Sequence, residues 1–161
     1  MPSIRIVETT DFELVASLLA ESPALVHPPS PEKLKREHKR GAHFFLAYYD
    51  DQVCGTICAK KVTFFASEIK YLYVKPECRG RGIGKALVKY ATDYADNELN
   101  TPVKMAVTHI DNYIVQHINE YFGYRPVGTF KSPLSNNILV LYIKINDIVE
   151  VNEENLAEWE M

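Results

Sequence analysis

The chain has 161 residues, 47% of them hydrophobic and 24% charged, which is typical of a single globular domain and too apolar for a disordered protein. Its longest unbroken aliphatic and aromatic run, residues 138–143, is far shorter than the ~18 residues of a membrane-spanning helix, and Glu8 and Asp11 interrupt any secretory signal, so neither is expected. The net charge is −3 because residues 147–161 contain six acids and no lysine or arginine. We therefore expect a mildly basic single domain over 1–146 and an acidic tail over 147–161. The basic charge of the domain is too weak for a nucleic-acid binder, so no nucleic-acid partner is expected.

The N-terminal part of the sequence predicts one strand and two helices. A short strand over 4–7 precedes a helix that Thr10 or Asp11 caps and that carries apolar residues at helical spacing. Four prolines between 23 and 31 end this helix, and the last of them suits the first turn of a second helix over 32–40. The second helix is highly charged and has little apolar face, so we expect it on the surface.

The remainder of the sequence predicts six more strands and two more helices. An amphipathic helix follows a glycine-rich segment, and Gly123 ends the last helix as a left-handed cap. The strands are expected at 44–49 and 53–59, which form a hairpin, and then at 67–75, 103–108, 127–130 and 138–145; the last helix is expected at 112–122. This order predicts an α/β fold of the α+β type, with a mixed, largely antiparallel sheet of about seven strands and helices on both faces.

Residues 79–85, RGRGIGK, are the most informative stretch. Three glycines at alternate positions let the backbone approach a ligand and direct several amide N–H groups toward one point, which suits an anion. The helix that begins here directs the positive end of its dipole to the same place, yet Arg79, Arg81 and Lys85 lie there, where cations are unfavourable by ~0.3–1 kcal/mol each. A bound anion would reverse this penalty, whereas a glycine turn that only joins a strand to a helix leaves the cations unexplained.

The spacing of the glycines argues against two nucleotide-binding motifs. A Walker A loop needs G-x4-G-K followed by Ser or Thr, but Gly80 and Gly84 are one residue too close and Ala86 follows Lys85. A dinucleotide-binding loop needs G-x-G-x-x-G after a first strand and an acid about 20 residues later, neither of which is present. A P-loop nucleoside triphosphatase and a Rossmann fold are therefore not expected.

The run from Tyr71 to Leu87, YLYVKPECRGRGIGKAL, resembles the acetyl-CoA motif of the GNAT superfamily of N-acetyltransferases, in which R/Q-x-x-G-x-G/A holds the pyrophosphate. The run from Asn112 to Tyr124 is similar to the later N-x-x-A-x-x-x-Y-x-x-x-G-F pattern of that family, and the element order agrees over most of the chain. The resemblance implies a GNAT-like acyl-CoA N-acyltransferase fold. It also implies an enzyme that moves the acetyl group of acetyl-CoA, its cosubstrate, to a primary amine of a small molecule or a protein, by direct attack in a ternary complex.

The resemblance further implies roles for individual residues. Backbone groups at Leu72, Tyr73 and Val74 would pair with the pantetheine arm, and one N–H of this strand would polarise the thioester oxygen. Asn112 would contact the cofactor arm, and Asn119 would lie beside the cofactor, at the position where the family usually has the tyrosine that protonates the CoA thiolate. The pyrophosphate would be held by Arg79, Gly80, Arg81, Gly82, Ile83, Gly84 and Lys85.

Two residues are candidates for a general base, which the acceptor needs because a lysine-like amine with a pKa of ~10.4 is less than ~0.1% neutral at pH 7. Glu68 is similar in placement to the glutamate that acts as base in part of the family; the alternative is an exposed carboxylate paired with Lys70 or Lys61. His109, just after a predicted strand, is the second candidate, and its alternative is a structural role.

The general acid is where the sequence departs from the family pattern. Asn119 cannot donate a proton at neutral pH, and Tyr121 lies about 200° around the helix from it and should face elsewhere. Another group such as His117, a water molecule, or unassisted departure of a thiolate with a pKa near ~8.5 remain as alternatives. The missing tyrosine also leaves open a non-catalytic acyl-CoA-binding regulator of the same fold.

The three cysteines predict reduced core thiols. Cys54 and Cys58 would lie roughly 13 Å apart on one strand, which forbids a disulfide between them, and Cys78 leaves the number odd. No pair of cysteines or histidines has zinc-site spacing, so we expect no metal. A cytoplasmic protein follows from these expectations, and a homodimer is a further one because dimers are common in the family.

Overall fold

The computed structural model describes residues 3–146, so the predicted acidic tail lies outside the described residues. The strands are β1 (Ile4–Thr9), β2 (Ala42–Tyr49), β3 (Gln52–Lys61), β4 (Ala66–Val74), β5 (Val103–His109), β6 (Arg125–Lys131) and β7 (Ile138–Ile145). The helices are α1 (Phe12–Ala20), α2 (Pro31–Lys39), α3 (Ile83–Asn97) and α4 (Tyr113–Tyr121), with a short 3₁₀ helix η1 (Pro76–Cys78) before α3. The predicted order of elements is confirmed.

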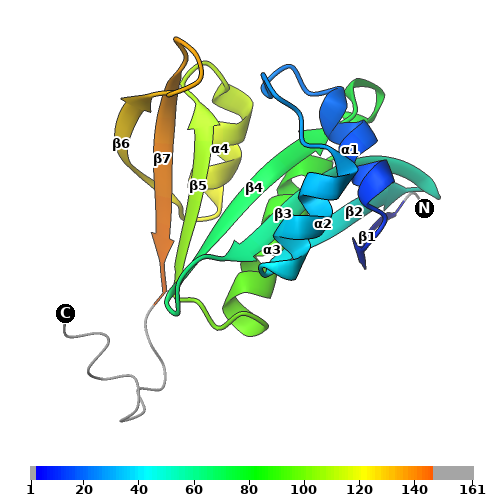
Figure 1. The fold of residues 1–161 in the computed structure, drawn as a ribbon, viewed down its shortest axis with the longest axis horizontal. Helices are drawn as coiled ribbons and strands as arrows, with labels where there is room; N and C mark the ends of the chain where they lie inside the picture. The colour runs from blue at the N-terminus through cyan, green and yellow to red at the C-terminus, as the bar shows by residue number, and fades with distance from the viewer. Residues whose placement is uncertain (1–2, 147–161) are drawn as a thin grey trace.

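One seven-stranded sheet in the order β1-β2-β3-β4-β5-β7-β6 organises the molecule (Figure 1). All neighbouring strands are antiparallel except β4 and β5, which are parallel. The predicted mixed, largely antiparallel sheet is therefore confirmed. No helix within residues 3–146 is long and apolar enough to cross a membrane.

Local sequence signals account for the ends of the helices. The Asp11 carboxylate accepts a hydrogen bond from the Leu14 N–H at 3.1 Å and begins α1, and Ser30 does the same for α2. Gly123 follows α4 with φ +89°, the left-handed conformation that glycine adopts without a steric penalty. Such caps depend on neighbouring residues only, so the sequence predicts the Gly123 cap and gives Asp11 as one of two candidates beside Thr10. The Ser30 cap is not among the predictions.

The helices cover both faces of the sheet, as predicted. Helices α1 and α2 pack on one face, where Leu18, Leu19 and Phe44 belong to one buried cluster, and α3 packs on the other face (Figure 1). The second helix lies on the surface, as predicted, and its Leu34 is fully buried in the first cluster. Helix α2 is thus held firmly against the sheet.

The parallel pair β4–β5 is short, and this determines where a ligand can enter. Pairing extends only from Ala66 opposite Val103 to Glu68 opposite Met105. Beyond that point β4 stays paired with β3, whereas β5 stays paired with β7, so the two strands separate (Figure 1). The sheet is therefore open along one edge of β4 from residue 69 onward.

Candidate active site

A cleft of about 360 Å³ lies where β4 and β5 separate. Its walls come from residues 68–72 of β4, residues 106–109 of β5, the loop after α1 and one face of α4. Three of the predicted functional side chains, Glu68, His109 and Asn119, line this one cleft, and Leu72 and Asn112 line it as well. The structure thus brings together residues that are up to 51 positions apart in the sequence.

The glycine-rich segment forms the turn into α3. Gly80 and Gly82 have φ of +80° and +81°, and Gly82 is the N-cap of α3 without any side-chain hydrogen bond. Gly84 has a different function, because it lies within the helix and a Cβ there would come within 3.3 Å of Ile118 on α4. The first N–H groups of a helix have no acceptor within the helix, and the first turn of α3 contains no acid. These donors and the helix dipole suit an anion.

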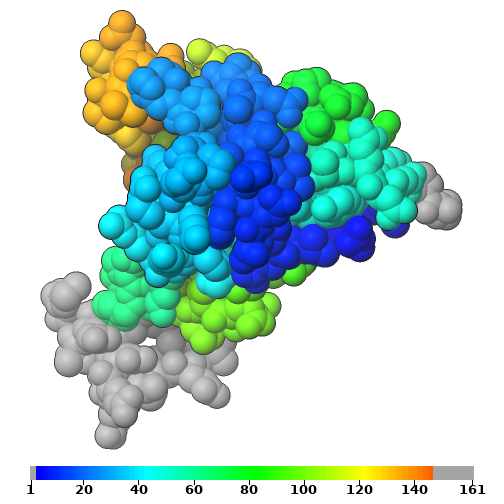
Figure 2. All heavy atoms as spheres, turned by 45° about the vertical axis from the view of Figure 1, so that its right-hand side comes forward, coloured from blue at the N-terminus to red at the C-terminus, as the bar shows by residue number. Residues whose placement is uncertain are grey.

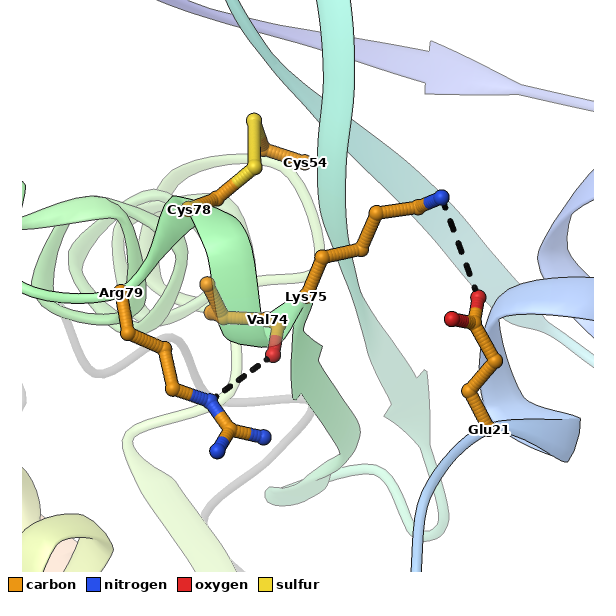
Figure 3. The surroundings of a disulfide bond; sticks show 6 residues. All are labelled: Glu21, Cys54, Val74, Lys75, Cys78 and Arg79. Atoms are coloured by element: carbon orange, nitrogen blue, oxygen red, sulfur yellow. Dashed lines mark hydrogen bonds and ion pairs between the residues drawn. A yellow bond between two sulfur atoms is a disulfide. The ribbon is translucent and has the colours of Figure 1, made fainter.

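The three cations beside this turn have no carboxylate partner within the described part of the chain. Arg79 donates a hydrogen bond from Nε to the Val74 carbonyl at 3.2 Å, which leaves the rest of its guanidinium available (Figure 3). The guanidinium of Arg81 lies 4.6 Å from the centre of the Tyr49 ring, and the ammonium of Lys85 lies 4.5 Å from that of Tyr121. All three side chains are exposed, so their positive charge is available to a ligand.

Cys54 and Cys78 form a disulfide directly before this turn, with 5.8 Å between their Cα atoms (Figure 3). The prediction of three reduced thiols is therefore wrong for this pair and correct for Cys58, a free and buried cysteine. A register shift in the β2–β3 pairing after Ala47 leaves Cys54 opposite no β2 residue, and Cys54 and Cys58 belong to clusters on opposite faces of the sheet. The expected cytoplasmic location loses one of its supports, because disulfides are rare in the cytosol.

The free thiol of Cys58 is not a candidate nucleophile. The side chain is fully buried, and burial raises its pKa to about 12. The thiol therefore stays protonated and unreactive at neutral pH.

The strand that was predicted to bind the cofactor arm contains a bulge. Lys70 is opposite Cys58 and Tyr73 is opposite Thr56, so two β4 residues face a single β3 residue. Tyr71, one of the two, has φ of +58°. Leu72 and Val74 pack toward the α3 face of the sheet, and Tyr73 is almost fully buried on the other face. Their side chains are therefore core residues, and the backbone edge of β4 that faces β5 is what remains for a ligand.

Glu68 is half-buried in the wall of the cleft. The alternative of an ion pair with Lys70 is not found, because Lys70 Nζ lies 2.9 Å from the carboxylate of Glu37 on α2 instead. Within residues 3–146 no hydrogen bond or ion pair occupies the Glu68 side chain, and none joins it to Lys61. The carboxylate is thus free to meet a ligand in the cleft.

His109 lies in the same cleft, but one of its two ring nitrogens already makes a hydrogen bond within the protein. Its Nε2 is 3.1 Å from the Ala24 carbonyl in the loop after α1, and because a carbonyl only accepts, Nε2 carries the proton. Only Nδ1 could then accept a proton from a substrate. The contact also ties β5 to the loop, which meets the tip of the β6–β7 hairpin near the top of Figure 2, where residues 24–27 and 132–137 line a second, smaller groove. This supports the structural alternative for His109.

Two asparagines of α4 face the cleft, seven residues apart on one side of the helix. Asn112 accepts the N–H of Val115 at 3.2 Å and so begins α4, which leaves its amide nitrogen available. Asn119 is 3% exposed, and its Nδ2 is buried without a hydrogen-bond partner among residues 3–146. An unsatisfied buried donor costs about 1–3 kcal/mol, so this atom is a position where a bound acceptor atom would restore a missing interaction.

The other candidates for the general acid lie outside the cleft. Tyr121 is 65% exposed and lies under Lys85, as its position on the helix predicts. His117 is exposed and does not line the cleft. Among the described residues that line the cleft, Tyr71 has a phenol, but its hydroxyl is bonded to Glu37.

Comparisons with known proteins agree with this geometry. The pattern of the Acetyltransferase (GNAT) family matches residues 12–124. The chain belongs to the GNAT acetyltransferase family. It is therefore a GNAT-type N-acetyltransferase, and the matched residues include the whole glycine turn and both asparagines.

Curated relatives of this GNAT protein are distant. It is 24% identical over 109 residues to a Bacillus subtilis (strain 168) protein described as a candidate ribosomal protein bS18-alanine N-acetyltransferase, covering 66% of this chain and 71% of that protein. It is 33% identical over 82 residues to an uncharacterised N-acetyltransferase of Methanocaldococcus jannaschii, a match that spans 51% of this chain and 52% of that protein, about half of each.

Solved structures confirm the GNAT fold. The ribosomal-protein-S18-alanine N-acetyltransferase from Escherichia coli superposes with a TM-score of 0.76 at 14% identity, covering 94% of this chain and 98% of that one. A GNAT family acetyltransferase from Elizabethkingia anophelis with acetyl-CoA bound gives a TM-score of 0.72 at 19% identity, covering 89% and 98%. At these identities the likeness concerns the fold, and the predicted acyl-CoA N-acyltransferase fold is confirmed.

Proposed function

We propose that this GNAT protein transfers the acetyl group of acetyl-CoA to a primary amine by direct attack in a ternary complex. The observation that carries the proposal is the turn into α3, where left-handed Gly80 and Gly82 lie at a helix start with no acid and with three cations that have no carboxylate partner within residues 3–146. A diphosphate supplies the negative charge that this arrangement lacks. The acetyl-CoA bound in the Elizabethkingia anophelis structure supports the same cosubstrate.

The residues of the turn and of β4 would divide the cofactor between them. The pyrophosphate would lie on the N–H groups from Gly80 to Lys85, between Arg79 and Arg81. The pantetheine arm would extend along the open edge of β4 at residues 72–74, as an added strand. The amide nitrogens of Asn112 and Asn119 would donate to it from the opposite wall, and for Asn119 this would satisfy a donor that is otherwise without an acceptor.

Transfer requires that the amine nitrogen attack the thioester carbonyl carbon, that the carbon–sulfur bond break, and that the nitrogen lose a proton. Glu68 is the proposed base, directly or through a water molecule, because its side chain lines the cleft and makes no hydrogen bond or ion pair with another described residue. A backbone N–H at the β4 bulge would stabilise the developing oxyanion. The thiolate would leave without a proton donor, since Asn119 can donate only a hydrogen bond.

The acceptor site would be the outer part of the cleft, between the loop after α1 and β5. Glu68 gives the cleft a carboxylate, which favours a cationic amine over an anionic acceptor. The names of two similar proteins refer to an alanine of a ribosomal protein, so a peptide that begins with alanine belongs in any acceptor screen, beside polyamines, amino acids and aminoglycoside-like amines. A homodimer is the remaining proposal, and the edge strand β6, whose residues are all exposed, would be available for pairing with a second copy.

Two measurements test the proposal. Wild-type protein should bind acetyl-CoA in calorimetry and release CoA thiol when an active amine is present. Gly82→Asp should weaken acetyl-CoA binding about 10- to 100-fold, since it removes charge-assisted hydrogen bonds and adds a like charge. Gly128→Asp is the matched control, because a Cβ at that glycine on β6 meets open space and the site is distant in the sheet. Unchanged affinity in Gly82→Asp would rule the placement out.

One observation speaks for the alternative of a non-catalytic acyl-CoA-binding protein: the cleft lining that the structure describes has no free phenol, because the Tyr71 hydroxyl is bonded to Glu37. The same assay separates the two functions. Tight acetyl-CoA binding without thiol release in any amine mixture would favour the regulator.

A further inference from the structure

The β4 bulge contains a strained residue at the wall of the cleft. Tyr71 has φ of +58°, a strained region that bulky side chains rarely occupy. Such a conformation persists only where surrounding contacts hold it in place. The contacts that hold Tyr71 come from outside the strand.

Glu37, in the last turn of α2, makes those contacts. Its Oε1 accepts a hydrogen bond from Lys70 Nζ at 2.9 Å, and its Oε2 accepts one from the Tyr71 hydroxyl at 3.1 Å. The Lys70 ammonium also lies 4.8 Å from the centre of the Tyr71 ring. One carboxylate therefore binds two consecutive residues of β4, whose side chains share a face only because the bulge turns them there.

The charges of this group favour the bonded arrangement. The Glu37 side chain is 13% exposed and that of Lys70 is 22% exposed, so water screens the pair weakly. Burial lowers the pKa of Lys70, but the hydrogen bond that Lys70 donates to Glu37 and the nearby charge of Glu68 outweigh this effect and raise the pKa overall. Burial and the Glu37 charge raise the pKa of Tyr71, so its hydroxyl stays protonated and donates.

Helix α2 is itself well anchored, which gives the carboxylate a fixed position. Leu34, one turn earlier, is fully buried, and His38 Nδ1 donates to the Ala42 carbonyl at 2.9 Å. Glu37 does not line the cleft, whereas Lys70, Tyr71 and Leu72 do. Any effect of Glu37 on a ligand must therefore act through β4.

We propose that Glu37 is a positioning residue, which clamps Lys70 and Tyr71 and so fixes the β4 bulge whose peptide groups face the acetyl thioester. This rests on the proposed function, because it assumes that acetyl-CoA lies along β4. A bulge leaves one residue outside the regular ladder, and its peptide group is free to meet a ligand. Without the clamp the strained conformation is less populated, and that peptide group is no longer held toward the thioester oxygen.

The test compares acetyl-CoA with CoA, which lacks the acetyl carbonyl. In calorimetry on the full chain, Glu37→Gln should weaken acetyl-CoA binding about three- to tenfold, the usual contribution of one hydrogen bond, and leave CoA affinity unchanged. Tyr71→Phe, which removes only the hydroxyl, should likewise lower the ratio of acetyl-CoA affinity to CoA affinity. Glu32→Gln is the control, since Glu32 is an exposed carboxylate on the same helix.

The outcomes separate the two proposals. A ratio that falls in Glu37→Gln and Tyr71→Phe but not in Glu32→Gln supports the clamp. If wild type binds acetyl-CoA and the ratio is unchanged in both variants, Glu37 only anchors α2 and the clamp is refuted while the proposed function stands. If wild type binds neither compound, the proposed function fails and the clamp fails with it.

Discussion

Replacing Asn119 by leucine should make the ligand-free protein more stable and acetyl-CoA binding weaker. The amide is 3% exposed and its Nδ2 has no hydrogen-bond partner, so wild type carries the cost of a buried donor, about 1–3 kcal/mol. Leucine has a similar size, forms helix better and leaves no unsatisfied donor. A gain of roughly 1–2 kcal/mol is expected, which raises the Tm of a chain of this length by about 2–8 °C.

The change in affinity should have the opposite sign. If Nδ2 donates to bound acetyl-CoA, its loss weakens binding about three- to tenfold. Differential scanning calorimetry without ligand and isothermal titration with acetyl-CoA measure the two effects separately. Asn97→Leu is the matched control, because Asn97 is an exposed asparagine at the end of α3, and it should change neither quantity.

A single result would refute this reasoning. If Asn119→Leu is less stable than wild type and binds acetyl-CoA equally well, the amide is satisfied within the folded protein and has no role toward the cofactor. If Asn119→Leu is more stable than wild type but binds acetyl-CoA equally well, the conclusion that the wild-type amide is unsatisfied stands, and the placement of Asn119 at the cofactor is refuted.

Three further predictions follow from the same structure. Glu68→Gln should lower the transfer rate about 10²- to 10⁴-fold near neutral pH with cofactor affinity unchanged, and higher pH should restore much of the rate because more of the amine is then neutral. His109→Gln should lower the rate less. A Glu68→Gln enzyme with near-wild-type kcat/KM across pH 6 to 9 would assign the base to His109 or to solvent. Reducing the Cys54–Cys78 disulfide, which closes a loop with a sequence separation of 24, should lower the free energy of unfolding by about 3.5 kcal/mol, and alkylation of all three cysteines in the denatured, unreduced protein would disprove the bond. Deleting residues 148–161 should leave acetyl-CoA affinity unchanged, because acidic residues repel an anionic ligand, and a large loss with the fold retained would contradict this.

Local patterns in the sequence determined the elements and the glycine-rich turn at residues 79–85. Apolar periodicity, the Asp11 cap and the left-handed Gly123 each depend on residues a few positions apart, so they could be predicted without the fold. The turn at Gly80 and Gly82 could be predicted for the same reason, because its glycines, its cations and the start of the helix are neighbours in the sequence. The element order then predicted the mixed sheet, which the structure confirms.

Only the tertiary structure decided which distant residues meet. A register shift in β3 allows Cys54 to reach Cys78, and the bulge in β4 turns Lys70 and Tyr71 toward the same carboxylate of α2. The β4 bulge has no glycine to mark it. The unpaired Cys54 lies next to Gly55, but a lone glycine in a strand does not tell which residue leaves the pairing or what that residue will contact. The hydrogen bond of His109 to Ala24, 85 residues away, and the unsatisfied amide of Asn119 depend likewise on how strands and helices pack, which no local pattern encodes.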